Sequence, residues 1–94
     1  PWAVHGAWVE GLAAWRGGLL RDADNAFGRV ARQASDPEVR AAGNFWAARA
    51  ATALGEAEKA QPRLRAAARD AETFYGMLAS ETLGVTASVQ RENL

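Results

Sequence analysis

The chain has 94 residues, 49% of them hydrophobic, and eleven basic residues balance eleven acidic ones. This length suits one domain or part of one, with enough apolar residues for a modest core. The balanced charge argues against a nucleic-acid partner, no apolar run is long enough to span a bilayer, and the lack of cysteine excludes disulfides and cysteine-based metal sites.

Alanine dominates the composition and favours helix along the whole chain. There are 23 alanines, six valines and no isoleucine. Alanine loses no side-chain entropy in a helix, whereas β-branched residues lose χ1 freedom. We therefore expect an all-α fold of about five helices. Because the sequence begins Pro-Trp without an initiator methionine, we expect a fragment of a longer protein.

The first predicted helix has one apolar stripe. Its members recur at i, i+4, i+7 and i+11 and are Trp8, Leu12, Trp15 and Leu19. The pair Gly17-Gly18 then breaks the helix. The apolar face of a second helix consists of Ala23, Phe27, Val30, Ala31 and Ala34. Together these helices predict a first hairpin over residues 2–34.

The stretch SDPE predicts the start of a third helix. Either Ser35 or Asp36 is the N-cap, Pro37 lies in the first turn, and Glu38 is placed to complete a capping box. The helix continues to Leu54, after which a glycine occupies the left-handed stop position.

A fourth helix completes a second hairpin over residues 36–71, with an apolar face of Ala60, Leu64, Ala67 and Ala68. Pro62 conflicts with this helix, because an interior proline costs about 3 kcal/mol. We expect the helix either to start near Gln61 or to be kinked there.

A shift of 37 residues places the first helix pair on the second. The matched positions are Trp8 with Phe45, Gly11 with Ala48, Ala14 with Ala51, Gly18 with Gly55, Ala23 with Ala60 and Phe27 with Leu64. A helix, a glycine turn and a second helix at such a period are typical of an α-solenoid. The pattern resembles the tetratricopeptide repeat but lacks its terminal proline. We therefore expect a right-handed, tetratricopeptide-like α-solenoid of antiparallel helix hairpins.

The segment TFYGMLASETLG predicts a fifth helix over residues 73–83, capped by Thr73 and closed by Gly84, with a further element starting in residues 85–94. Its inward face is expected to contain Phe74, Met77 and Leu78, with Tyr75 as a further candidate. An interior glycine at position 76 costs about 1 kcal/mol relative to alanine. We interpret Gly76, with Ala79, as a groove that lets a neighbouring helix approach closely.

Two segments, NFWAARAATALGEAEKA and AAARDAETFYGMLASETLG, resemble the helical superhelix of bacterial soluble lytic transglycosylases. The matching positions are Ala42, Phe45, Trp46, Ala48, Arg49, Ala50, Leu54, Gly55, Phe74, Tyr75, Gly76, Leu78, Ala79, Leu83 and Gly84. The family often has tyrosine where this chain has Phe45. The resemblance implies a periplasmic peptidoglycan enzyme in which a separate lysozyme-like domain cleaves the glycan through the glutamate of a Glu-Ser motif, forming a 1,6-anhydro sugar.

This chain does not match that catalytic motif, since Ser80 precedes Glu81. We therefore assign it no catalytic residue, no cofactor and no metal site, and expect a scaffold. His5 is interpreted as a surface or cap residue, and Glu10 and Glu81 as solvated rather than as a catalytic pair.

The candidate binding residues are aromatic or basic. Trp2 and Tyr75 could form an exposed platform for sugar rings, whereas Trp8 and Trp15 belong to the apolar stripe and are expected in the core. Arg63 and Arg65 lie in an arginine strip that could meet an anionic polymer, although interleaved acidic residues favour a solvated face with local ion pairs.

Two functional hypotheses follow. The first is a scaffold segment of a lytic transglycosylase, whose partners are the rest of the parent chain and glycan strands or cell-wall proteins. The second is a tetratricopeptide-like protein-interaction module. We also expect the fragment to self-associate through the face of its first helix or the tail after Gly84, because so short a solenoid has open apolar ends.

Overall fold

The computed structural model describes residues 2–92, and every regular element in this range is an α-helix. The helices are α1 (Trp2–Arg16), α2 (Leu20–Gln33), α3 (Pro37–Ala53), α4 (Ala57–Arg69) and α5 (Phe74–Glu92). The predicted all-α fold of five helices is thus confirmed.

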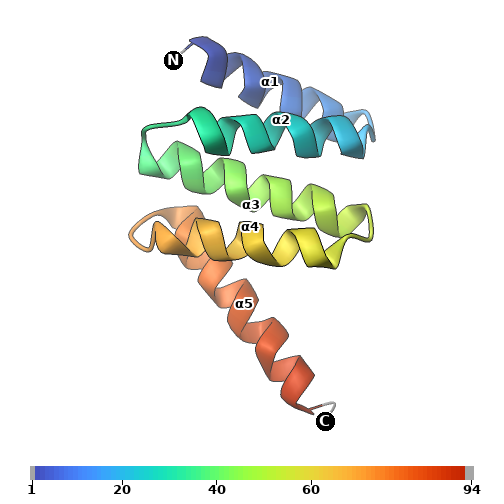
Figure 1. Ribbon diagram of the computed structural model, residues 1–94, viewed down its shortest axis with the longest axis vertical. Coiled ribbons are helices and arrows are strands. Elements are labelled where there is room, and N and C mark those ends of the chain that lie inside the picture. The colour runs from blue at the N-terminus through green and yellow to red at the C-terminus, as the bar shows by residue number, and fades with distance from the viewer. Residues whose placement is uncertain (1, 93–94) are drawn as a thin grey trace.

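The first four helices lie side by side in chain order (Figure 1). The short turns that join them lie at alternating ends of this stack. The last helix, α5, begins beside α3 and α4, packs against both, and then runs obliquely away from the stack.

Two glycine turns, at the α1–α2 and α3–α4 junctions, have the same geometry. Gly18 has φ +75° and Gly55 has φ +79°, a conformation that favours glycine because it has no Cβ. In both turns the next N–H bonds back to the carbonyl of an alanine four residues before the glycine, at 2.9 Å. The predicted period of 37 residues is therefore repeated in the backbone, and the left-handed stop at Gly55 is confirmed.

The core consists mainly of alanine, with a few large rings between the helices. Phe27 is fully buried at the centre of one cluster, against Ala14, Ala23, Ala47 and Ala50. A second cluster joins α3, α4 and α5, and its buried members are Phe45, Ala48, Ala51, Ala60, Leu64, Ala67 and Ala79. A Cβ on Gly11 would lie 2.6 Å from the Phe27 ring, so this glycine admits the ring. Leu19 does not join the predicted stripe; it lies in the turn after α1 and is 57% exposed.

Asp36 is the N-cap of α3, and its carboxylate accepts from the Glu38 N–H at 2.9 Å. Because the cap is Asp36 rather than Ser35, Glu38 is the second helical residue and not the third. No capping box forms, and the Glu38 carboxylate instead accepts from the N–H of Phe74 at 3.4 Å. This bond satisfies the first N–H of α5 from a neighbouring helix.

Pro62 lies inside α4, which is helical from Ala57, so the predicted late start near Gln61 is wrong. A proline at this position leaves the carbonyl of Glu58 without its helical donor. Both residues are exposed, and water can satisfy that carbonyl. Burial of Ala60 and Leu64 on the other face holds the helix in place.

The last helix does not end at Gly84 as predicted, but continues to Glu92. Gly84 has no positive φ, and a Cβ there would meet nothing within 4 Å. A glycine in the right-handed helical region costs only about 1 kcal/mol relative to alanine. This cost is too small to end a helix where no other local structure is more stable. The element expected over 85–94 is therefore part of α5 as far as residue 92, and its last two positions lie outside the described residues.

The inward face of α5 differs from the prediction. Phe74 is 62% exposed and Met77 57% exposed, whereas Tyr75 and Leu78 pack on the second core cluster. The predicted close approach at Gly76 exists, but its partner is the chain's own preceding turn and not a neighbouring helix. A Cβ there would overlap the carbonyl group of Asp70. The turn at Asp70 rotates the helix so that Phe74 points outward.

Candidate functional site

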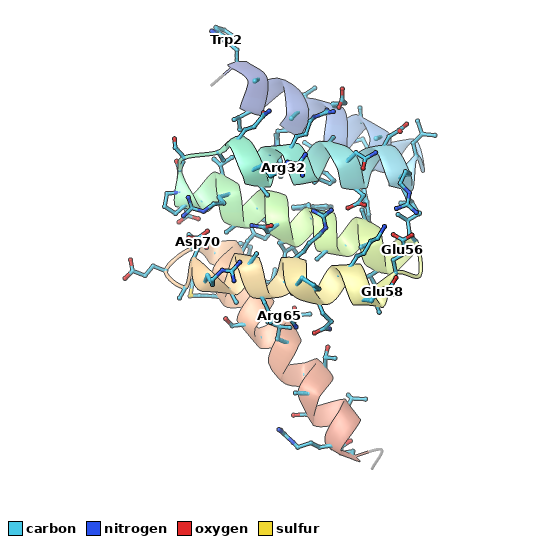
Figure 2. The ribbon with its side chains drawn as sticks, in the orientation of Figure 1. Trp2, Arg32, Glu56, Glu58, Arg65 and Asp70 are labelled. Atoms are coloured by element: carbon cyan, nitrogen blue, oxygen red, sulfur yellow. The ribbon has the colours of Figure 1, made fainter. Side chains whose placement is uncertain are left out.

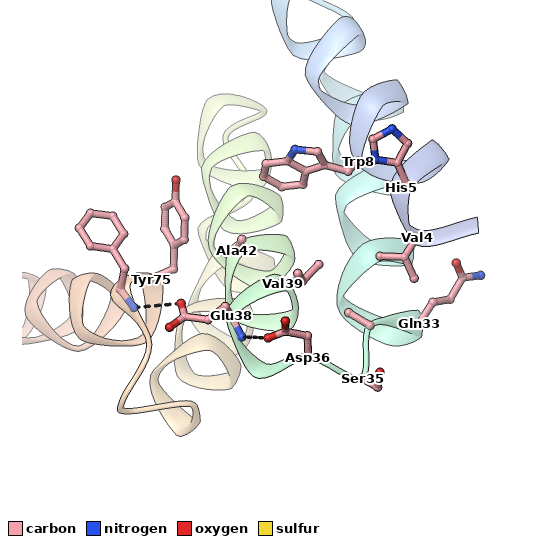
Figure 3. A pocket seen from close by; sticks show the side chains of 12 residues that line it. Val4, His5, Trp8, Gln33, Ser35, Asp36, Glu38, Val39, Ala42 and Tyr75 are labelled. Carbon is pink, nitrogen blue, oxygen red and sulfur yellow. Dashed lines mark hydrogen bonds between the residues drawn. The ribbon is translucent and has the colours of Figure 1, made fainter. Parts of the chain in front are cut away.

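A hollow lies over α3, between the start of α1 and the start of α5 (Figure 3). Its volume is about 630 Å³, within the range of about 300–1,000 Å³ that is usual for ligand pockets. Its walls are mainly apolar and aromatic. It is lined by Val4, His5, Trp8, Gln33, Ala34, Ser35, Asp36, Glu38, Val39, Ala42, Phe74 and Tyr75.

Aromatic rings form two opposite walls of this hollow. Figure 3 shows Trp8 reaching in from α1 and Tyr75 facing it from α5. The core holds both rings, since Trp8 packs on Phe27 with ring centroids 5.5 Å apart and Tyr75 packs on Phe45 at 5.3 Å. Phe74 stands edge-on to Tyr75 at 5.0 Å and extends that wall. The walls are therefore positioned before any ligand arrives.

Two exposed carboxylates, Asp36 and Glu38, form the rim at the start of α3. Each accepts one backbone hydrogen bond, as described above. Among the described residues neither has a basic side chain within ion-pair distance. The rim is therefore acidic, with His5 as the one other titratable group in the lining apart from the Tyr75 phenol.

Other carboxylates of the stack are neutralised by arginines on neighbouring helices. Arg21 donates two hydrogen bonds to Glu56, at 2.9 and 2.6 Å, and this pair lowers the pKa of Glu56 to about 2. Arg40 donates two to Asp70, at 3.0 and 2.7 Å, and this pair lowers the pKa of the Asp70 carboxyl. Figure 2 shows Glu56 and Asp70 at opposite ends of α4, so the two pairs fix both ends of that helix.

A smaller hollow of about 370 Å³ lies on the same α1–α3–α5 side, near the C-terminal ends of α1 and α3. The Arg49 guanidinium lies there over two rings, 5.2 Å from the centroid of Trp15 and 4.6 Å from that of Trp46. The buried indole N–H of Trp46 has no hydrogen-bond partner among the described residues. A guanidinium on aromatic faces is a cation–π arrangement. Arg49 therefore makes an intramolecular cation–π contact with both tryptophans.

Of the four candidate binding residues, the structure brings only Tyr75 to the hollow beside Trp8. Trp2 is 89% exposed and projects from the start of α1, and Arg65 is exposed on α4 (Figure 2). The Arg63 guanidinium lies 3.0 Å from the buried carboxylate of Asp24, so its charge joins α4 to α2. Arg63, one of the arginines of the predicted binding strip, therefore has a structural role.

Sequence reasoning assigned only Tyr75 of the lining residues to binding, and it gave no binding role to Trp8, Asp36 or Glu38. The apolar stripe of the first helix predicts only the core contact of Trp8. The ring is partly buried on Phe27 and partly open to the hollow. The two carboxylates were interpreted only as capping residues. No local pattern links them to Tyr75, because the chain brings these positions together only when α5 packs on α3.

The two carboxylates interpreted from the sequence as solvated, Glu10 and Glu81, lie on α1 and α5. Glu10 pairs with Arg29, and Glu81 is exposed on α5. Within residues 2–92 no group of three or more histidine, aspartate or glutamate side chains is arranged to hold a metal ion. No helix in the described range combines the length and the apolarity that a bilayer crossing requires.

Exposed apolar side chains gather on the first and last helices. They include Trp2 and Val9 on α1, and Phe74, Met77, Val85 and Val89 on α5. The sequence predicts self-association through the face of the first helix or the tail after Gly84, where Val85 and Val89 lie, and light scattering over a range of concentrations would test it.

Comparison of the chain with models of known protein families, with curated protein sequences and with solved structures found no match.

Proposed function

We propose that this chain is a non-catalytic scaffold segment of a periplasmic lytic transglycosylase. The observation that carries the proposal is the position of the residues behind the family resemblance. Seven of the fifteen form or pack against one cluster that joins α3 and α4 to α5: Phe45, Trp46, Ala48, Tyr75, Leu78, Ala79 and Leu83. Residues that build a junction between helices suit a scaffold rather than a catalytic centre.

The proposed architecture is a right-handed, tetratricopeptide-like solenoid of antiparallel hairpins, 2–34 and 36–71, followed by the first helix of a third unit. The equivalent turns at Gly18 and Gly55 support it. So do the helix starts, because Asp36 and Thr73, which are 37 residues apart, each accept a hydrogen bond from an N–H of the helix that follows.

The gene that encodes this chain provides the decisive test. If the proposal holds, the reading frame that contains residues 1–94 also encodes a lysozyme-like domain with a Glu-Ser motif. The encoded protein should fractionate with the periplasm and release 1,6-anhydro products from purified peptidoglycan. The isolated segment should release none. A reading frame without such a domain would refute the proposal.

A second candidate function is protein binding by a tetratricopeptide-like module, and the hollow between Trp8 and Tyr75 favours it. Its aromatic walls are open to solvent and are held rigid by the core. If this function is correct, the isolated chain should bind a protein partner stoichiometrically and should not sediment with purified peptidoglycan. Co-sedimentation without a protein partner would favour the scaffold function instead.

A further inference from the structure

We propose that the hollow between Trp8 and Tyr75 binds the side chain of an arginine or lysine in an extended segment of a partner protein. The proposal rests on the second candidate function, protein binding at this hollow, and deepens it by naming the chemistry of the partner. It does not depend on the lytic transglycosylase assignment.

The walls suit a cation. The faces of tryptophan and tyrosine attract an ammonium or guanidinium group within about 6 Å of the ring centroid, by about 0.5–2 kcal/mol depending on desolvation. The chain itself places Arg49 on Trp15 and Trp46 in this way, at 5.2 and 4.6 Å. The opposed rings of the hollow offer similar faces to a cation from outside.

The rim has the complementary charge. Asp36 and Glu38 form the rim at the start of α3, and each can accept further hydrogen bonds at its carboxylate. The nearest arginine of α3, Arg40, is already committed to Asp70 by two hydrogen bonds. An incoming basic side chain would therefore meet two carboxylates that make no direct ion pair with a described residue, although the charge of Arg40 acts on Asp36 from farther away.

The shape also selects the occupant. A basic side chain combines an apolar stem with a charged end, and the lining combines Val4, Val39 and Ala42 with the acidic rim. An acidic segment would be repelled by the rim, and a purely apolar one would desolvate two carboxylates without pairing them. About 630 Å³ is enough for one long side chain with its adjacent backbone.

The test is a selection from a random peptide display library on the immobilised chain. We expect the selected peptides to share an arginine or lysine next to apolar residues. The strongest binder is then synthesised with its basic residue intact and with citrulline or norleucine in its place, and isothermal titration calorimetry compares their affinities. The neutral peptide should bind at least about tenfold more weakly, the loss expected for one charge-assisted contact.

Two variants locate the site. Asp36→Asn with Glu38→Gln removes both rim charges but keeps the capping and acceptor groups, so the fold should be retained and affinity for the basic peptide should fall about tenfold. The matched control, Asp22→Asn with Glu58→Gln, removes two exposed charges from α2 and α4 and should change the affinity less than about twofold. Trp8→Leu should also weaken binding, with circular dichroism confirming helical content.

The outcomes separate the two claims. Selected peptides that lack a basic residue but lose binding in Trp8→Leu would overturn the cation proposal and leave protein binding at the hollow intact. Equal affinities for the basic and neutral peptides, or equal effects of the two charge variants, would also overturn it. A library that yields no peptide dependent on Trp8 would overturn both the cation proposal and the second candidate function.

Discussion

Replacing Gly76 by alanine provides a direct test of how α5 is joined to the stack. In an open helix interior this exchange stabilises by about 0.8–1 kcal/mol, because alanine has the higher helix propensity. At Gly76 the new Cβ would overlap the Asp70 carbonyl oxygen and lie 2.7 Å from both the carbonyl carbon and the Thr73 Oγ1. The turn that begins α5 must therefore move.

The movement has an identifiable cost. Thr73 Oγ1 accepts from the Gly76 N–H at 2.9 Å and donates to the Asp70 carbonyl at 2.6 Å, so the Cβ displaces both ends of this cap. Losing a cap costs about 1 kcal/mol, and overpacking costs about 1–3 kcal/mol. After subtraction of the propensity gain, Gly76→Ala should lower the free energy of unfolding by about 1–3 kcal/mol.

Gly84 provides the matched control on the same helix. A Cβ there meets nothing within 4 Å, so Gly84→Ala should raise the free energy of unfolding by as much as about 1 kcal/mol. Urea unfolding of both variants, followed by circular dichroism, measures the two changes, and each kcal/mol should shift the melting temperature by about 4–8 °C in a domain of this size. If Gly76→Ala is as stabilising as Gly84→Ala, the contact with Asp70 has no energetic role and our account of this turn is wrong.

Three further predictions follow from burial, capping and charge. Phe27→Ala should cost about 3–5 kcal/mol in urea unfolding because the ring is fully buried, whereas Phe74→Ala, at an exposed position, should cost less than about 1 kcal/mol. Thr73→Ala should cost about 0.5–2 kcal/mol through loss of the α5 cap, and serine at the same position should restore most of this stability. The pKa of Glu56 is lowered from 4.5 to about 2, first by the Arg21 hydrogen bonds, so this pair contributes stability above pH 4.5 that is lost as the pH falls towards 2. The melting temperature of Arg21→Gln should therefore fall less than that of the wild type over this pH range, and equal falls would contradict the assignment.

The sequence predicted those parts of the fold that depend on local physics. Glycine turns, the proline-led start of α3 and the alanine-rich packing faces are local signals, and the repeat of 37 residues made the glycine turns and the packing faces appear twice. The all-helical fold followed from them. The predicted late start near Pro62 and the predicted stop at Gly84 were wrong for the same reason. An interior proline or glycine costs a few kcal/mol or less, and packing of the opposite face or a favourable helix around it outweighs that cost.

The site was less predictable, because it depends on the rotation of α5. The turn from Asp70 to Thr73 turns Tyr75 towards Phe45 and Phe74 towards solvent, and nothing in the spacing of these residues specifies that angle. The carboxylate of Glu38 reaches the first N–H of α5, which a prediction of local caps does not anticipate. Contacts between residues far apart in the chain, 30 positions for Phe45 and Tyr75 and 36 for Glu38 and Phe74, therefore decided which residues line the hollow.

The matching turns at Gly18 and Gly55 have a consequence for how such a chain can change over time. Both turns are closed by the same pattern of backbone hydrogen bonds. An in-frame duplication or deletion of one 37-residue unit would therefore recreate an existing turn and would not require a new one. Recombination that changes the number of units would then preserve the turn at each junction, and the number of stacked helices would become a trait open to selection.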